Sequence, residues 1–231
     1  MTDDSERDIR QGARRRPRVM AVVNLKGGTG KTTTAAFLGH ARAATGDRVT
    51  FVDADHPQYA LSRWAELAGW DLPVMGLGTK QLHVQLPGIL TAATCDLAVI
   101  DTPPLEEHRG IVTAALRAAD DVIVTLAPTT AELHRTGAVF DAIDDVAPLR
   151  TTPARVMVCL NRVDRRARAD RVIRAALTDA GHHVLDHDVP LRQAYAQAFG
   201  SAGSAVDPDE IWTELAAEIV DDRQLEIGGA A

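Results

Sequence analysis

The chain places a glycine-rich turn between a strand-like run and a helix-like run. Residues 22–34 read VVNLKGGTGKTTT, and alanine-rich sequence follows. Gly27, Gly28 and Gly30 allow the backbone to curl so that its N–H groups converge, and the positive end of the next helix dipole lies at the same place. A turn of this kind binds phosphate groups. The strand-to-helix context favours that interpretation over a turn that needs glycine only for its shape.

Alternating strand and helix patterns continue along the rest of the chain. The apolar runs lack in/out alternation, which is expected when helices cover both faces of a parallel sheet. The predicted strands are Val19–Asn24, Val49–Asp53, Leu97–Asp101, Val122–Leu126 and Val156–Asn161. The predicted helices are Lys31–Ala44, Ala60–Ala68, Ile111–Ala118, Ala131–Asp145, Arg165–Ala180 and Asp209–Asp222. We therefore predict an α/β fold of the P-loop NTPase kind, a mostly parallel twisted sheet between two helix layers.

Length and composition fit one compact domain, because the chain has 231 residues of which 45% are hydrophobic. We place this domain at residues 18–222, between a basic flexible arm at 1–17 and a disordered tail at 223–231. Pro and Gly interrupt residues 70–94, where we expect loops and one short strand. No apolar run is long enough for a membrane span, and the N-terminal segment MTDDSERDIRQGARRRPR lacks the apolar core of a signal peptide, which predicts a cytoplasmic protein.

Lysine is scarce in this chain. It has 22 arginines but only three lysines, and two of the three, Lys26 and Lys31, flank the glycine-rich turn. A compact ammonium group fits between phosphate oxygens in a way that the wide guanidinium does not. We expect Lys31 to contact the β- and γ-phosphates and the Thr32 hydroxyl to bind Mg²⁺.

Three aspartates end predicted strands. From Asp101 a carboxylate can hold Mg²⁺ through water, although a strand end can also use Asp as a turn former. Asp53 and Asp55 are two residues apart, so both carboxylates point to the same side, toward the edge of the sheet where phosphates bind. Capping of the next helix is the alternative for this pair.

The segment KGGTGKTT, with Lys26 at its start, resembles the deviant Walker A box of the ParA/MinD family of P-loop ATPases, most closely the short ParA-type partition proteins. Further segments resemble family motifs: FVDAD at 51–55, DLAVIDTPP at 96–104, VCLNRVD at 158–164 and DVPLRQAYAQA at 188–198. The resemblance implies that ATP and Mg²⁺ are the cofactors. The implied nucleotide-binding residues are Lys26, Gly27, Gly28, Thr29, Gly30, Lys31, Thr32, Thr33, Asn161 and Pro190.

The resemblance also implies roles for individual side chains. Lys26 would cross a dimer interface to the partner's ATP, rather than being only an exposed loop lysine. Asp55 would orient the attacking water, and Asp53 would support the Mg²⁺ shell. Asn161 would pair with adenine, with Pro190 against the base, although a turn-forming Asn is equally compatible with the sequence. The family's usual Asp-Pro-Gln is interrupted here by His56, which puts the positioning of water in doubt.

Arginines gather on one side of the helix predicted after Asp164. At 100° per residue they lie opposite its apolar arc, and a solvated face is the ordinary explanation of such a pattern. In ParA proteins, basic residues of this region bind DNA without sequence preference. The candidate DNA-binding residues are Arg165, Arg166, Arg168, Arg171, Arg174 and Arg192.

We therefore expect a partition ATPase that forms an ATP-dependent homodimer and binds nucleoid DNA non-specifically. Its hydrolysis of ATP is expected to be slow and to be stimulated by a ParB-like adaptor. The alternatives are a ParA-like switch that positions a protein cargo and, third, a MinD-like membrane regulator. The chain ends in DDRQLEIGGAA, which lacks the basic amphipathic helix that binds membranes.

The net charge of −7 does not argue against DNA binding, because residues 207–231 alone carry eight acidic residues and one basic residue.

Overall fold

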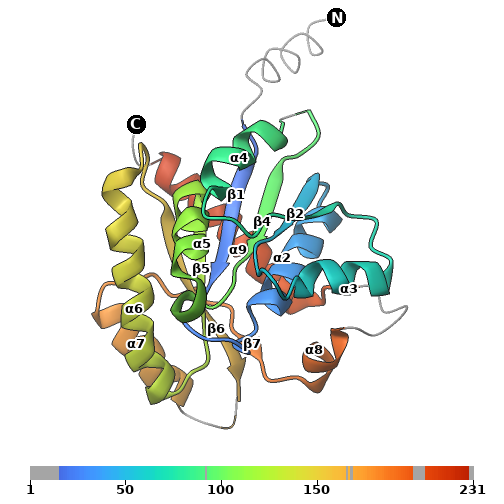
Figure 1. Cartoon of the computed structure of the whole chain (residues 1–231). Coiled ribbons are helices and arrows are strands. Elements are labelled where there is room, and N and C mark those ends of the chain that lie inside the picture. The colour runs from blue at the N-terminus through green and yellow to red at the C-terminus, as the bar shows by residue number, and fades with distance from the viewer. Residues whose placement is uncertain (1–15, 92, 165, 167–168, 200–205, 229–231) are drawn as a thin grey trace, which may run out of the picture.

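The computed structural model describes residues 16–91, 93–164, 166, 169–199 and 206–228, with the backbone alone at 221–228. Its centre is a parallel sheet of seven strands in the order β3-β2-β4-β1-β5-β6-β7 (Figure 1). The strands are β1 (Arg18–Val23), β2 (Val49–Asp53), β3 (Val74–Gly76), β4 (Leu97–Asp101), β5 (Asp121–Leu126), β6 (Arg155–Val163) and β7 (Val189–Pro190). The five predicted strands and the predicted fold class are confirmed.

Helices cover both faces of the sheet, and each face has its own apolar core. One core packs the sheet against α4 (Leu82–Ile89), α5 (Leu105–Ala118), α6 (Thr130–Val146) and α7 (Ala169–Asp179). The other packs it against α2 (Lys31–Ala44), α3 (Ala60–Ala68), α8 (Gln193–Ala198) and α9 (Glu210–Gly228). A short 3₁₀ turn, η1 (Ala147–Leu149), follows α6. Among the described residues, no helix is both long enough and apolar enough to cross a membrane.

The largest departure from prediction is helix α4, which lies in the stretch expected to be loops. Leu82 and Leu86, one helical turn apart, are both buried against the sheet. Pro87 lies in the last turn, where a missing N–H donor disturbs few hydrogen bonds. Burial of the two leucines therefore outweighs the local breakers, a tertiary effect that propensity alone does not show.

Other helix boundaries also differ from the predicted ones. Helix α5 begins at Leu105 rather than Ile111, with a non-helical backbone at His108. Helix α7 is assigned from Ala169, and α9 continues past Asp222 to Gly228. Strand β7 and helix α8 were absent from the prediction, because two and six residues are too short for a periodic pattern.

The described part of the basic N-terminal region is held by ion pairs. Arg16 pairs with Asp120 at 2.5 Å, and Arg18 pairs with the fully buried Asp121 at the start of β5. Arg155 approaches the same Asp121 carboxylate at 3.0 Å. These contacts fix the beginning of β1 against its neighbours. The remainder of the proposed arm, residues 1–15, lies outside the described residues.

Candidate functional site

The glycine-rich loop joins the end of β1 to the start of α2, as predicted. The Asn24 side chain connects this loop to β5. Its Oδ1 accepts a hydrogen bond from the Lys26 N–H at 3.1 Å, and its Nδ2 donates to the Thr125 carbonyl. Gly30 precedes α2 with a φ of 91°. Side chains rarely adopt this left-handed conformation, so glycine is required there.

Lys31 is buried at the first position of α2. Its Nζ donates to the Lys26 carbonyl at 2.8 Å, so the ammonium lies over the loop that would receive phosphate. Burial lowers the pKa of Lys31, and the carboxylates of Asp101 and Asp55 oppose that shift. A buried cation of this kind is stabilised by an anion placed against it, which matches the role predicted for Lys31.

Thr32 and Asp101 meet beside the loop. The Thr32 hydroxyl donates to Asp101 Oδ2 at 2.7 Å. Asp101 is fully buried, burial raises its pKa well above the ordinary range, and its second oxygen, Oδ1, accepts no hydrogen bond from the described residues. A hydroxyl and a carboxylate with a free oxygen are a donor set that suits Mg²⁺. Thr32 and Asp101, two of the three residues predicted to hold the metal, are therefore brought together.

Asp53 lies next to Asp101 across the β2–β4 pairing, in which the two residues are direct partners. Its carboxylate accepts hydrogen bonds from the backbone N–H groups of Ser62 at 2.8 Å and of Asp55 at 3.2 Å. The alternative role, capping of helix α3, is thus present in the structure. A place for Asp53 in the Mg²⁺ shell stays a prediction.

Asp55 is half-buried at the end of β2, on the side of Lys31. Burial raises the pKa of Asp55, and the nearby Lys31 ammonium lowers it by less. Within the part of the chain that the structure describes, no hydrogen bond to the Asp55 carboxylate is formed. It is therefore available to a water molecule or phosphate, as a water-orienting group must be.

Lys26 lies at the exposed rim of the loop. Its Nζ pairs with Glu106 Oε1 at 3.3 Å, and the two side chains are 40% and 38% exposed. The first turn of α5 is also tied to the loop through its backbone, because Leu105 N donates to Asn24 O at 3.2 Å and Glu106 N donates to Leu25 O at 3.1 Å. Sequence analysis missed Glu106; the acidic pair that follows Pro104 was the available signal.

Asn161 lies against the loop from the end of β6. Its Nδ2 donates to the Thr29 carbonyl at 3.3 Å, and a Cβ added at Gly30 would lie 2.4 Å from the same nitrogen. Asn161, Thr33 and Pro190 line a small hollow beside the loop, together with Tyr195 of α8. This places the predicted adenine-binding residues together, and adenine contact stays a prediction. Tyr195, which the sequence analysis did not include, donates to Asp209 at 2.6 Å.

Comparison with known proteins gives the family. The model for the CobQ/CobB/MinD/ParA nucleotide binding domain matches residues 20–203. The chain belongs to this family. Maintenance of carboxysome distribution protein A of Gloeobacter kilaueensis is 32% identical to it over 183 residues, which cover 79% of this chain and 78% of that protein.

Solved structures have the same fold. Apo McdA of Cyanothece superposes with a TM-score of 0.70 at 18% identity, covering 87% of this chain and 99% of that one. Cobyrinic acid a,c-diamide synthase of Mycobacterium smegmatis, with a bound ATP analogue and magnesium, gives 0.64 at 25% identity, covering 90% and 96%. ATP and Mg²⁺, the cofactors predicted from the loop, are therefore those found in the family.

The described arginines among those predicted to bind DNA fall into two groups. Arg166 and Arg171 are exposed, whereas Arg165 and Arg168 lie outside the described residues. Arg174 pairs with Asp188 at 2.5 Å and also donates to the Leu185 carbonyl at 2.6 Å.

Arg192 is also held in place, by Asp209 at 2.6 Å. In this member of the CobQ/CobB/MinD/ParA family, Arg174 and Arg192 thus have structural roles that the sequence did not reveal. DNA contact by the six arginines stays a prediction.

Proposed function

We propose that this chain is an ATP-driven switch that positions a protein cargo, the second of the functions expected from its sequence. The observation that carries this is the site itself: a P-loop whose rim presents Lys26, beside the assembled Lys31, Thr32 and Asp101. The name of the Gloeobacter kilaueensis relative, a carboxysome distribution protein, supports cargo positioning over partition of DNA.

Each side chain has a defined task in this proposal. Lys31 and the loop N–H groups bind the β- and γ-phosphates, and Thr32 and Asp101 hold Mg²⁺. When bound there, Mg²⁺ would supply positive charge against the phosphates. Asp55 orients a water molecule whose oxygen attacks the γ-phosphorus, while the bond to the β–γ bridging oxygen breaks and ADP and phosphate form.

Lys26 makes nucleotide binding and self-association one event. To contact the ATP of a second copy it must leave Glu106, and separating an ion pair as exposed as this one costs only about 0–1 kcal/mol. Two lysines that approach each other across an interface repel, and ATP phosphates offset that repulsion. When phosphate leaves, the repulsion returns and the dimer separates.

DNA serves as the surface over which the switch moves its cargo, held by exposed arginines such as Arg166 and Arg171. A dimer presents each of these twice, so it binds a polyanion more tightly than a monomer does. Partition of a plasmid or chromosome is the second candidate, since the family includes ParA. An adaptor that itself binds repeated DNA sites would identify partition, whereas an adaptor attached to a protein assembly would identify cargo positioning.

We expect binding to random-sequence DNA with Mg·ATP and not with ADP or without nucleotide, measured by fluorescence anisotropy. Replacing Arg166 and Arg171 together by Ala should weaken it about tenfold or more and reduce its salt dependence. Arg63→Ala, which changes an exposed arginine of α3, is the matched control and should leave the affinity within about twofold. Equal binding in all three nucleotide states would show that the chain is not a nucleotide switch of this kind.

A further inference from the structure

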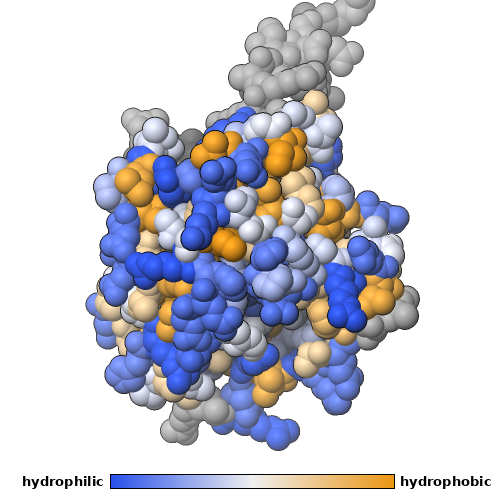
Figure 2. Space-filling view, in the orientation of Figure 1, coloured by the Kyte–Doolittle hydropathy of each residue, from blue (hydrophilic) through white to orange (hydrophobic). Residues whose placement is uncertain are grey.

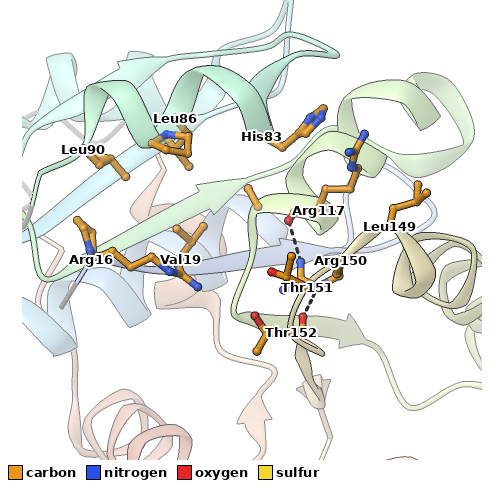
Figure 3. A pocket seen from close by; sticks show the side chains of 13 residues that line it. Arg16, Val19, His83, Leu86, Leu90, Arg117, Leu149, Arg150, Thr151 and Thr152 are labelled. Atoms are coloured by element: carbon orange, nitrogen blue, oxygen red, sulfur yellow. Dashed lines mark hydrogen bonds between the residues drawn. The ribbon is translucent and has the colours of Figure 1, made fainter.

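A groove lies at the end of the sheet opposite to the nucleotide site, between α4, the last turn of α5 and η1 (Figure 3). Its volume is about 370 Å³, within the range of ligand-binding clefts. Apolar side chains line much of it: Val19, Leu86, Leu90 and Leu149. We call it the α4–α5 groove.

Among the described residues, arginines line the α4–α5 groove and acidic residues do not. Arg16 is neutralised by Asp120. Arg150 donates to four carbonyl oxygens and thus caps the end of α5: those of Leu116 at 2.5 Å, Arg117 at 2.9 Å, Ala119 at 2.5 Å and Thr152 at 3.1 Å. Figure 3 shows the bonds to Arg117 and Thr152, and among the described residues one N–H of the guanidinium has no acceptor. Within the described residues neither Arg117 nor Arg150 forms an ion pair. The groove therefore keeps the positive charge of two guanidinium groups.

His83 adds an unsatisfied polar atom to the lining. It lies on α4, and its Nδ1 is buried without a hydrogen-bond partner among the described residues.

The apolar surface continues out of the groove. Val84 and Ile89 on α4 are 66% and 47% exposed, and Leu149 at the groove wall is 58% exposed. Figure 2 shows apolar side chains gathered on this face over α4, with hydrophilic residues around them. Exposed apolar patches with a polar rim are characteristic of surfaces that bind another protein.

We propose that the α4–α5 groove binds an acidic, amphipathic peptide segment of a partner protein. Apolar side chains of the peptide cover Leu149 and the α4 patch, and its carboxylates pair chiefly with the exposed Arg117 and with the remaining N–H of Arg150. A small anion would satisfy the arginines and leave the apolar patch exposed, and a basic segment would be repelled. The proposal does not depend on the nucleotide switch, because the groove lies at the far end of α5 from the P-loop.

The test uses the full chain without nucleotide and a fluorescein-labelled helical peptide with leucines at every third or fourth position and glutamates elsewhere. We expect it to bind about tenfold more tightly than the same peptide with glutamines in place of glutamates. Arg117→Glu should weaken binding by about tenfold or more, and Leu149→Glu by a similar factor. Arg63→Glu, on the opposite layer of helices, should change it by less than about twofold.

Four results would overturn the proposal. The glutamine peptide could bind as tightly as the glutamate peptide, or Arg63→Glu could weaken binding as much as Arg117→Glu. Binding could occur only after removal of residues 1–15, in which case the chain's own arm is the occupant. Finally, the chain could self-associate without nucleotide in a manner that Leu149→Glu abolishes, in which case the groove binds a second copy.

Discussion

Replacing Lys31 by Ala should lower the affinity for Mg·ATP by at least about 100-fold, because hydrogen bonds from an ammonium to phosphate are charge-assisted and each contributes about 1.5–3 kcal/mol. The Lys31 ammonium is already buried over the loop, and among the described residues its one hydrogen bond goes to the Lys26 carbonyl at 2.8 Å. Phosphate would supply an anion in direct contact with this buried cation, which the more distant carboxylates of Asp101 and Asp55 do not. Lys31→Arg should also fail, since the planar guanidinium does not fit a site shaped for a point charge.

Calorimetric titration with Mg·ATP measures this effect. Lys80→Ala is the matched control, because it removes the remaining lysine of the chain, which packs beside Gly110 and outside the loop. Its affinity should stay within about twofold of the wild type. Circular dichroism establishes that both variants are folded. Wild-type affinity in Lys31→Ala would show that the loop does not bind phosphate through this residue.

Asp101→Asn should have two opposite effects. Hydrolysis should fall by at least about 100-fold, because the amide cannot replace a carboxylate that holds Mg²⁺ against the phosphates. The nucleotide-free protein should become more stable by about 1 kcal/mol at pH 8, because a buried carboxylate with an unpaired oxygen disfavours the fold. Thr32 can still donate to the remaining oxygen of the amide.

The raised pKa of Asp101 determines in which direction the stability of the folded protein changes with pH. Burial raises the pKa of Asp101 in the folded state, so the folded protein binds this proton more tightly than the unfolded chain. Stability is therefore lost as the pH rises above the ordinary Asp value of about 4, and the loss continues up to the raised pKa.

Thermal melting without nucleotide, from pH 5 to pH 8, measures the difference. The advantage of Asp101→Asn should grow over this range. A lower melting temperature than the wild type at pH 8 would contradict the account.

The sequence predicted those parts of the site that depend on the succession of neighbouring strands, loops and helices along the chain. In parallel units a strand end, a loop and a helix start follow one another, so Lys31, Thr32 and Asp101 could be placed from their positions alone. The lysine count added a second, independent indication for Lys26 and Lys31. The strands were predicted well because buried parallel strands are uninterrupted apolar runs.

Features that depend on long-range contacts could not be predicted in this way. Helix α4 forms because Leu82 and Leu86 reach the core, against the preferences of Pro87 and Gly88. Arg174 and Arg192 are held by Asp188 and Asp209, which follow them by 14 and 17 residues. Helical periodicity describes one helix at a time, so it could not show that carboxylates beyond the helix hold these arginines in place.

The central claim is that ATP binding and self-association are one event in this chain, with Lys26 as the connecting residue. Sedimentation velocity with Mg·ATP, with ADP and without nucleotide tests it most directly, on the wild type and on Lys26→Ala. We predict a dimer only for the wild type with Mg·ATP, and a monomeric Lys26→Ala that still binds ATP. A Lys26→Ala protein that dimerises with Mg·ATP as the wild type does, or a wild type that dimerises equally without nucleotide, would contradict the claim.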